Sequence, residues 1–156
     1  MKQPKAKLQH EGVEPKIQYA ALPWRRRKVL EILLITSRGT GRWIIPKGWP
    51  MKGRKPHTTA AIEAIQEAGL LGKIEKKAIG VFHYQKVLGN NERLLCRVEV
   101  FPLRVARQMK TWPEMHQRVT KWFPLREAIR LVSDPELVDV FEEFARRTSK
   151  PVKKAA

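Results

Sequence analysis

The chain has 156 residues, of which 42% are hydrophobic, so it is long enough to bury one core and is best read as a single domain. Its 32 Lys and Arg residues outnumber the 15 Asp and Glu residues; the resulting formal charge of +17 predicts an anionic partner, either a phosphorylated small molecule or a nucleic acid such as RNA. No apolar run approaches the ~20 residues that a membrane-spanning helix needs, so we expect no membrane association.

Both ends of the chain are polar, lysine-rich and contain proline, a composition typical of flexible segments. We therefore expect a basic N-terminal tail over residues 1–15, a single domain over residues 16–147 and a basic C-terminal tail over residues 148–156. The one cysteine, Cys96, cannot form an internal disulfide, which suits a reducing compartment. The cytoplasm is the expected location, and the sequence leaves the oligomeric state open.

The first part of the domain predicts three strands. Residues 17–24 (IQYAALPW) and residues 29–36 (VLEILLIT) are short apolar runs, the second rich in branched side chains, as in strands. The polar stretch SRGTGR then predicts a turn, and residues 43–45 (WII) predict a short third strand that ends at Pro46.

Residues 56–68 predict a helix, because Pro56 suits the first turn and Gly69 suits the left-handed position just past the end. At ~100° per residue, one narrow apolar stripe, which we expect to be buried, is formed by Ala61, Ile65 and Ala68.

The same geometry places Glu63, Gln66 and Glu67 together on the opposite side of this helix. Two carboxylates one turn apart repel each other unless a cation lies between them. A hard divalent ion with oxygen ligands, such as Mg²⁺, would supply that cation, and the competing interpretation is a solvated helix face neutralised by nearby Lys and Arg.

The second part of the domain predicts a hairpin, a short strand and two terminal helices. The turn signal Gly89-Asn90-Asn91 separates two strand-like runs. The predicted elements are strands over residues 73–88, 92–105 and 121–125, and helices over residues 126–132 and 136–147. This arrangement indicates a mixed α/β domain.

The segment from Gly48 to Leu70 resembles the signature of the Nudix hydrolases: a Gly, five residues, a Glu, seven residues, then Arg-Glu-aliphatic-any-Glu-Glu-any-Gly-aliphatic. Counted from Gly48, the spacing reaches Glu63, Glu67 and Gly69 without an insertion. The run VLEILLITSRGTGRWIIPKG is similar to the approach to this signature in the branch that cleaves diphosphoinositol and diadenosine polyphosphates. The resemblance covers roughly residues 18–130 and implies an α/β/α sandwich with a mixed central sheet.

The signature is degenerate in this chain. Arg54 stands in place of its first Glu, Ile62 in place of its Arg, Ala64 at an aliphatic position, and Gln66 in place of the first member of the Glu-Glu pair. Gln66 still offers a neutral oxygen, but it cannot offset the charge of a cation.

The resemblance implies hydrolysis of a pyrophosphate bond with Mg²⁺, or Mn²⁺ in its place. The implied metal ligands are Glu63, Glu67 and Gln66, and the catalytic acids are Glu67, Glu63 and Glu114, the last from the segment TWPEMHQR. Arginine forks and lysine ammonium groups bind phosphate oxygens. The candidate substrate-binding residues are Arg25, Arg27, Arg38, Arg42, Lys47 and Gly48.

Several alternatives stay open at this point. The departures from the signature favour a catalytically weak or inactive domain that binds polyphosphate or RNA, whereas the retained acids oppose it. Two further interpretations are a nucleic-acid-binding protein with a basic face and an interaction module held by the terminal helices. The positive charge alone could also reflect an organism whose proteins are generally basic. The candidate substrates include dinucleoside polyphosphates, diphosphoinositol polyphosphates, nucleotides and capped RNA ends.

Overall fold

The computed structural model describes residues 14–149; most of the two predicted tails, residues 1–13 and 150–156, lies outside this range. The elements, in chain order, are β1 (Lys16–Arg26), β2 (Leu30–Thr36), β3 (Trp43–Ile44), β4 (Lys47–Gly48), α1 (Pro56–Ala68), β5 (Leu70–Ile74), β6 (Gly80–Val87), β7 (Arg93–Gln108), β8 (Thr120–Pro124), α2 (Leu125–Leu131) and α3 (Pro135–Ser149). The predicted strands and helices are present, except that β4 was not predicted and that the run predicted as one strand over residues 73–88 forms parts of β5 and β6.

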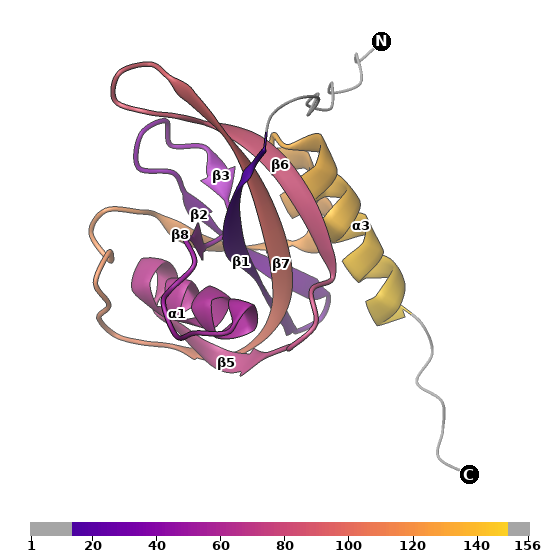
Figure 1. Ribbon diagram of the computed structural model, residues 1–156. Helices are drawn as coiled ribbons and strands as arrows, with labels where there is room; N and C mark the ends of the chain where they lie inside the picture. Colours follow the sequence, from indigo (N-terminus) through magenta and orange to yellow (C-terminus); the bar gives the residue numbers. More distant parts are fainter. Residues whose placement is uncertain (1–13, 150–156) are drawn as a thin grey trace.

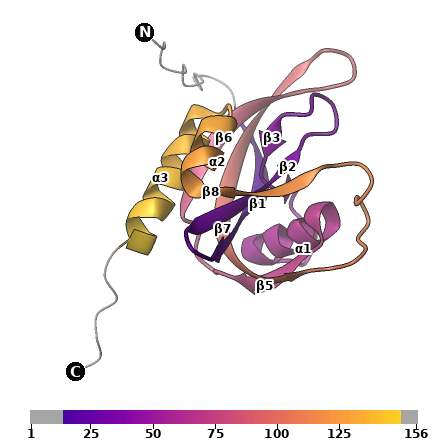
Figure 2. The ribbon, with the colours of Figure 1, turned by 180° about the vertical axis from the view of Figure 1, so that it is seen from behind.

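A mixed sheet forms the centre of the fold, with strand order β3-β2-β1-β7-β5, while β4 pairs with β1, β6 with β7 and β8 with β2. The central strands β1 and β7 are parallel, and the other pairs are antiparallel. Helix α1 covers one face of the sheet, and α2 and α3 cover the other (Figures 1 and 2). The predicted α/β/α sandwich with a mixed sheet is confirmed.

The central strands are apolar on both faces because helices cover both faces. In β2, Ile32 and Leu34 join the core cluster under α2 and α3, whereas Leu33 and Ile35 join the cluster under α1. Each such side chain contributes about 1.5–3 kcal/mol when it is fully buried. The two core clusters, one on each face of the sheet, hold β2 in place. The turn at residues 37–42, which follows β2, is thereby positioned beside the site.

Helix α1 has the predicted ends. Pro56 is its first residue, and Gly69 takes the left-handed conformation at φ 68°, with its N–H donating to the carbonyl of Ile65 at 2.9 Å. A side chain at Gly69 would also collide with the indole of Trp112, so the end of α1 lies against the segment that follows β7. The boundary is therefore set by backbone conformation and by close packing.

The predicted buried stripe of α1 is confirmed at Ala68 and wrong at Ala61 and Ile65. The fully buried apolar side chains of α1 are those of Ala60, Ala64 and Ala68, spaced four residues apart, whereas Ala61 and Ile65 are half-buried. Small side chains let the helix approach the sheet closely, which the larger Ile65 would prevent. As a result Glu67 is buried and Gln66 is exposed, so the three polar side chains do not form one cluster.

Two further boundaries differ from the prediction. The run over residues 73–88 is not one strand but two, because β5 and β6 pair with successive parts of β7 and an exposed bend at Lys76 and Lys77 separates them. The hairpin of β6 and β7 is confirmed. Helix α3 continues through Thr148 and Ser149, which the sequence placed in the tail.

Candidate active site

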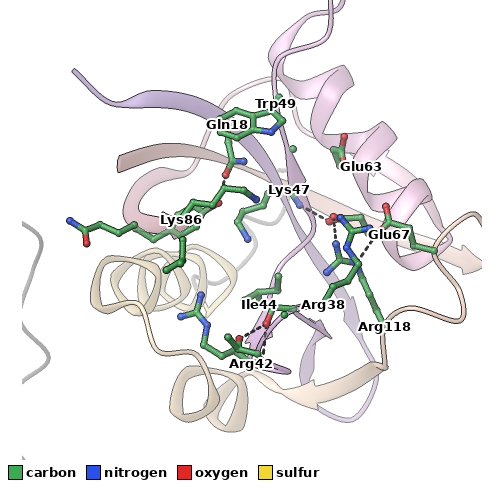
Figure 3. Close-up of a pocket in the computed structure, with 18 residues that line it drawn as sticks. Gln18, Arg38, Arg42, Ile44, Lys47, Trp49, Glu63, Glu67, Lys86 and Arg118 are labelled. Carbon is green, nitrogen blue, oxygen red and sulfur yellow. Dashed lines mark hydrogen bonds and ion pairs between the residues drawn. The ribbon is translucent and has the colours of Figure 1, made fainter. Parts of the chain in front are cut away.

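A cavity of about 610 Å³ opens between α1, the chain from β2 to β4, the end of β6 and the segment between β7 and β8. Figure 3 shows Glu63 and Glu67 of α1 directed into this region, with Lys47 and Arg118 beside Glu67. Three carboxylates line the cavity, from Glu63, Glu67 and Glu114. The acids predicted to be catalytic therefore converge from two separate elements.

Glu67 is held at both of its carboxylate oxygens. The backbone N–H of Lys47 donates to one oxygen at 2.9 Å, and a terminal nitrogen of Arg118 donates to the other at 2.8 Å. Only 8% of the Glu67 side chain is exposed, and this burial raises its pKa, while Arg118 and the Lys47 N–H oppose the increase. The position of Glu67 is thus fixed by a charged partner and by β4.

Glu63 lies one turn before Glu67 and packs against the backbone of β4. A Cβ atom at Gly48 would overlap the Glu63 carboxyl group, so this contact requires a glycine. Burial, followed by the charges of Glu67 and Glu114, raises the pKa of Glu63 to about 7, and Arg118 only partly opposes this. Within residues 14–149 the Glu63 carboxyl has no hydrogen bond or ion pair, which leaves it available to a ligand.

Glu114 is carried by a segment that is fastened to the end of α1. The Glu114 N–H donates to the carbonyl of Gln66 at 3.1 Å, and the Met109 N–H donates to the carbonyl of Gly69 at 2.7 Å. These bonds satisfy carbonyl groups that a helix end otherwise leaves unpaired. They also fix the Glu114 backbone next to the last turn of α1.

Arg118 joins the two acids. Its Nε donates to Glu114 at 3.1 Å, one terminal nitrogen donates to Glu67 at 2.8 Å, and the other donates to the carbonyl of Thr36 at 3.0 Å. Only 6% of this side chain is exposed. The guanidinium group is therefore a buried cation shared between two carboxylates.

Four further cations line the cavity: Arg38, Arg42, Lys47 and Lys86. Arg38 donates to Gln117 at 2.9 Å and lies 3.7 Å from a carboxylate oxygen of Glu114. The Lys47 ammonium group lies 4.9 Å from the ring centre of Tyr84, and burial lowers its pKa to about 8 against the attraction of Glu67. A cavity lined in this way attracts an anionic ligand.

Other predicted residues are not brought to the cavity. Arg25 forms an ion pair with Glu31 at 2.7 Å and stacks on Trp122 at 4.1 Å, and the exposed Arg27 lies just beyond the end of β1. Gly48, which lines the cavity, pairs with Tyr19 of β1. Arg25 lies six residues further along this strand, which corresponds to a distance of about 20 Å. The exposed side chain of Gln66 does not line the cavity either.

Sequence reasoning missed Arg118, Gln18, Tyr84 and Lys86, all of which line the cavity. The spacing of four residues between Glu114 and Arg118 signals a local ion pair, but nothing local to the sequence points from Arg118 to Glu67. Gln18 and Tyr84 are joined by a hydrogen bond of 2.6 Å from the Tyr84 hydroxyl. That contact depends on the placement of β1 and β6 on the two sides of β7.

The donor set fits a hard divalent ion. Within residues 14–149 no three His, Cys, Asp or Glu side chains are close enough to hold one ion together. Glu63 and Glu67 would hold it as a pair of carboxylates, an arrangement that Mg²⁺ accepts because it keeps several water ligands. Burial, followed by the charges of Glu67 and Glu114, raises the pKa of Glu63, and a cation bound beside it would favour its charged form.

Known proteins resemble this chain in sequence. No protein-family model matches it. Nudix hydrolase 21 of Arabidopsis thaliana is 30% identical over 131 residues, which cover 81% of this chain and 64% of that protein. Diphosphoinositol polyphosphate phosphohydrolase 3-alpha of mouse is 31% identical over 116 residues, which cover 72% of this chain and 66% of that protein. The chain thus spans less than two thirds of these relatives.

Solved structures share the fold. The Ap4A hydrolase of C. elegans matches 87% of this chain and 100% of its own, with a TM-score of 0.64 and 16% identity. The NUDIX domain of Shewanella oneidensis NrtR, complexed with ADP ribose, matches 88% of this chain and 90% of its own, with a TM-score of 0.66 and 12% identity. Among the described residues no helix is long and apolar enough to cross a membrane.

Proposed function

The chain belongs to the Nudix hydrolase family, and we propose that its cavity hydrolyses a pyrophosphate bond in an anionic polyphosphate with a divalent cation. The observation that carries this proposal is the convergence of three carboxylates and five Lys and Arg side chains on one cavity. Phosphoryl transfer to water needs positive charge around the phosphate oxygens and a carboxylate near the attacking water. Both kinds of group line this cavity.

A bound Mg²⁺ or Mn²⁺ ion would neutralise charge on the phosphate oxygens and make its bound water more acidic. We assign Glu63 and Glu67 as the residues that hold it. Arg38, Arg42 and Lys47 bind the remaining phosphate oxygens, and Lys47 stays protonated below about pH 8. Glu114 lines the cavity, and we assign its carboxylate as the group that orients the water.

The substrate class is a dinucleoside polyphosphate, a diphosphoinositol polyphosphate or a nucleotide. Diphosphoinositol polyphosphate, Ap4A and ADP ribose appear in the names of one relative and two solved structures. Trp49 lies at the cavity with 41% of its surface exposed, next to Lys86, whose ammonium group is 5.9 Å from the ring centre. A flat aromatic face beside a cation favours a substrate that has a base as well as phosphates.

The competing function is a weak or inactive domain that binds polyphosphate or RNA. Ile62 and the exposed Arg54 favour it, because they replace charged positions of the family signature. The retained acids of the cavity favour hydrolysis.

We also propose a cytoplasmic location, since Cys96 is the single cysteine and has no partner for an internal disulfide.

A panel of polyphosphates, assayed with Mg²⁺ and with Mn²⁺, tests the proposal. Metal-dependent release of phosphate or nucleotide, lost in Glu67→Gln, is the expected result. A protein that binds these compounds with millimolar or better affinity and cleaves none of them would support the binding domain instead.

A further inference from the structure

The carboxylate of Glu67 already has two hydrogen-bond donors, Arg118 and the backbone N–H of Lys47, and a bound cation would have to share it with them. Arg118 occupies one oxygen of Glu67 at 2.8 Å, while the Lys47 N–H occupies the other at 2.9 Å. Each carboxylate oxygen has a second lone pair, so an ion can still reach Glu67. It would then lie close to a guanidinium group that is itself almost completely buried.

Two cations that share one buried carboxylate repel each other strongly, because the surroundings screen them poorly. The backbone around Arg118 offers little relief, since Glu114 and Met109 fasten the segment to α1. The Arg118 side chain, in contrast, reaches Glu67 from 51 residues further along the chain and has other partners in Glu114 and Thr36. Two of the three hydrogen bonds of its guanidinium group thus go to partners other than Glu67, and these partners stay available when an ion replaces the Glu67 contact.

We propose that Arg118 and the divalent cation compete for Glu67, so that this arginine sets the metal affinity of the site. Arg118 neutralises Glu67 in the metal-free protein and turns away from it when an ion binds between Glu63 and Glu67. Because Arg118 also lines the cavity, the released guanidinium group faces the space where a phosphate would lie. This inference rests on the proposed metal-dependent function and adds to it a residue outside the family signature.

Mn²⁺ binding tests the competition without reference to activity. The concentration of free Mn²⁺, measured by its electron paramagnetic resonance signal, gives the dissociation constant of the wild-type protein and of its variants. We expect Arg118→Gln to bind Mn²⁺ about tenfold or more tightly than the wild type, because the substitution removes a buried positive charge beside the bound ion. Arg118→Lys keeps the charge but loses the fork, so its affinity should fall between the two.

Arg38→Gln is the matched control. Arg38 is also a cation near Glu114, at 3.7 Å, but 59% of its side chain is exposed and it makes no contact with Glu67. Removing it changes the net charge by the same amount, and solvent screens that change. Its Mn²⁺ dissociation constant should stay within about twofold of the wild-type value.

Removal of Arg118 leaves the buried Glu67 and the half-buried Glu114 without this cation, so the variant should be less stable in the absence of metal. Thermal unfolding with and without Mn²⁺ keeps the test decisive: the increase in Tm caused by Mn²⁺ should be larger in Arg118→Gln than in the wild type. If Arg118→Gln does not fold without metal, the same comparison is made with Arg118→Lys.

The competition for Glu67 and the metal-dependent function predict different results. If the wild type binds Mn²⁺ and hydrolyses a polyphosphate, but the Arg118 variants bind Mn²⁺ no more tightly, the competition is wrong and the function stands. Weaker binding in the variants would make Arg118 a residue that orients Glu67 for the ion. If neither the wild type nor any variant binds Mn²⁺, the competition and the metal-dependent function both fail.

Discussion

Gly48 lies against the carboxyl group of Glu63, so closely that even a single added methyl group would overlap it. The contact ties β4 to α1 beside the cavity, and it requires a glycine at position 48 of this chain. It also leads to a prediction that separates the geometry of the site from the stability of the fold.

Gly48→Ala should reduce kcat by about 10- to 100-fold, because the end of the Glu63 side chain must move away from its place beside Glu67. The cost in free energy of unfolding should be only about 1 kcal/mol, since a flexible side-chain end can move more easily than backbone. Gly89→Ala is the control, because nothing lies within 4 Å of a Cβ at that position. Equal losses of stability and activity in both variants would contradict the specific role of the Gly48 contact.

Glu67→Gln keeps the volume of the side chain but removes the negative charge that faces Arg118 and Lys47. We expect kcat/KM to fall by about 100-fold or more, on the scale of losing a central charged group. The exposed Glu75→Gln provides the control. Steady-state hydrolysis of the best substrate from the panel measures both, and undiminished turnover in Glu67→Gln would remove this residue from the metal site.

Much of this fold follows from local sequence patterns. The apolar runs predict β1, β2 and β8, and the pair Pro56 and Gly69 predicts both ends of α1. The buried face of α1 could not be predicted in the same way, because a helical projection gives more weight to Ile65 than to Ala64, while close packing on the sheet selects the alanine.

The site residues likewise fall into those that local sequence patterns reveal and those that only long-range contacts bring into place. Glu63 and Glu67 can be found from their spacing on one helix, whereas Arg118 meets Glu67 through a contact between residues 51 positions apart. Gln66 shows the converse, since its position in the signature suggests a ligand and its exposure in the fold points it away from the cavity. Such contacts depend on how the segment after β7 returns to α1, and no periodicity in the chain encodes that.

Arg42→Ala should raise KM more than it lowers kcat, because a phosphate contact at the cavity wall stabilises the bound substrate and the transition state alike. KM should also increase with ionic strength. Arg27→Ala is the matched control, since Arg27 is exposed and lies outside the cavity. A comparable increase in KM for Arg27→Ala would show that the substrate extends along β1 beyond the cavity.

The raised pKa of Glu63 makes the stability of the metal-free protein depend on pH. The unfolded chain loses this proton near the ordinary value of 4.5, whereas the folded protein keeps it until about pH 7. Between these values the folded state binds more protons than the unfolded state, so its contribution to the free energy of unfolding falls as the pH rises and becomes constant above about pH 7.

Glu63→Gln cannot lose a proton at this position, so it should gain stability relative to the wild type as the pH increases from 5 to 7.5. Urea unfolding in the presence of a chelator measures the free energy difference between the two proteins at each pH. Gly89→Ala, which changes no titratable group, is the control and should show the same difference from the wild type at pH 5 and at pH 7.5. Added Mg²⁺ should reverse the trend for the wild type at pH 7.5, because an ion at Glu63 stabilises the charged carboxylate. A pH-independent difference for Glu63→Gln would mean that this carboxyl group has the same pKa in the folded and the unfolded protein.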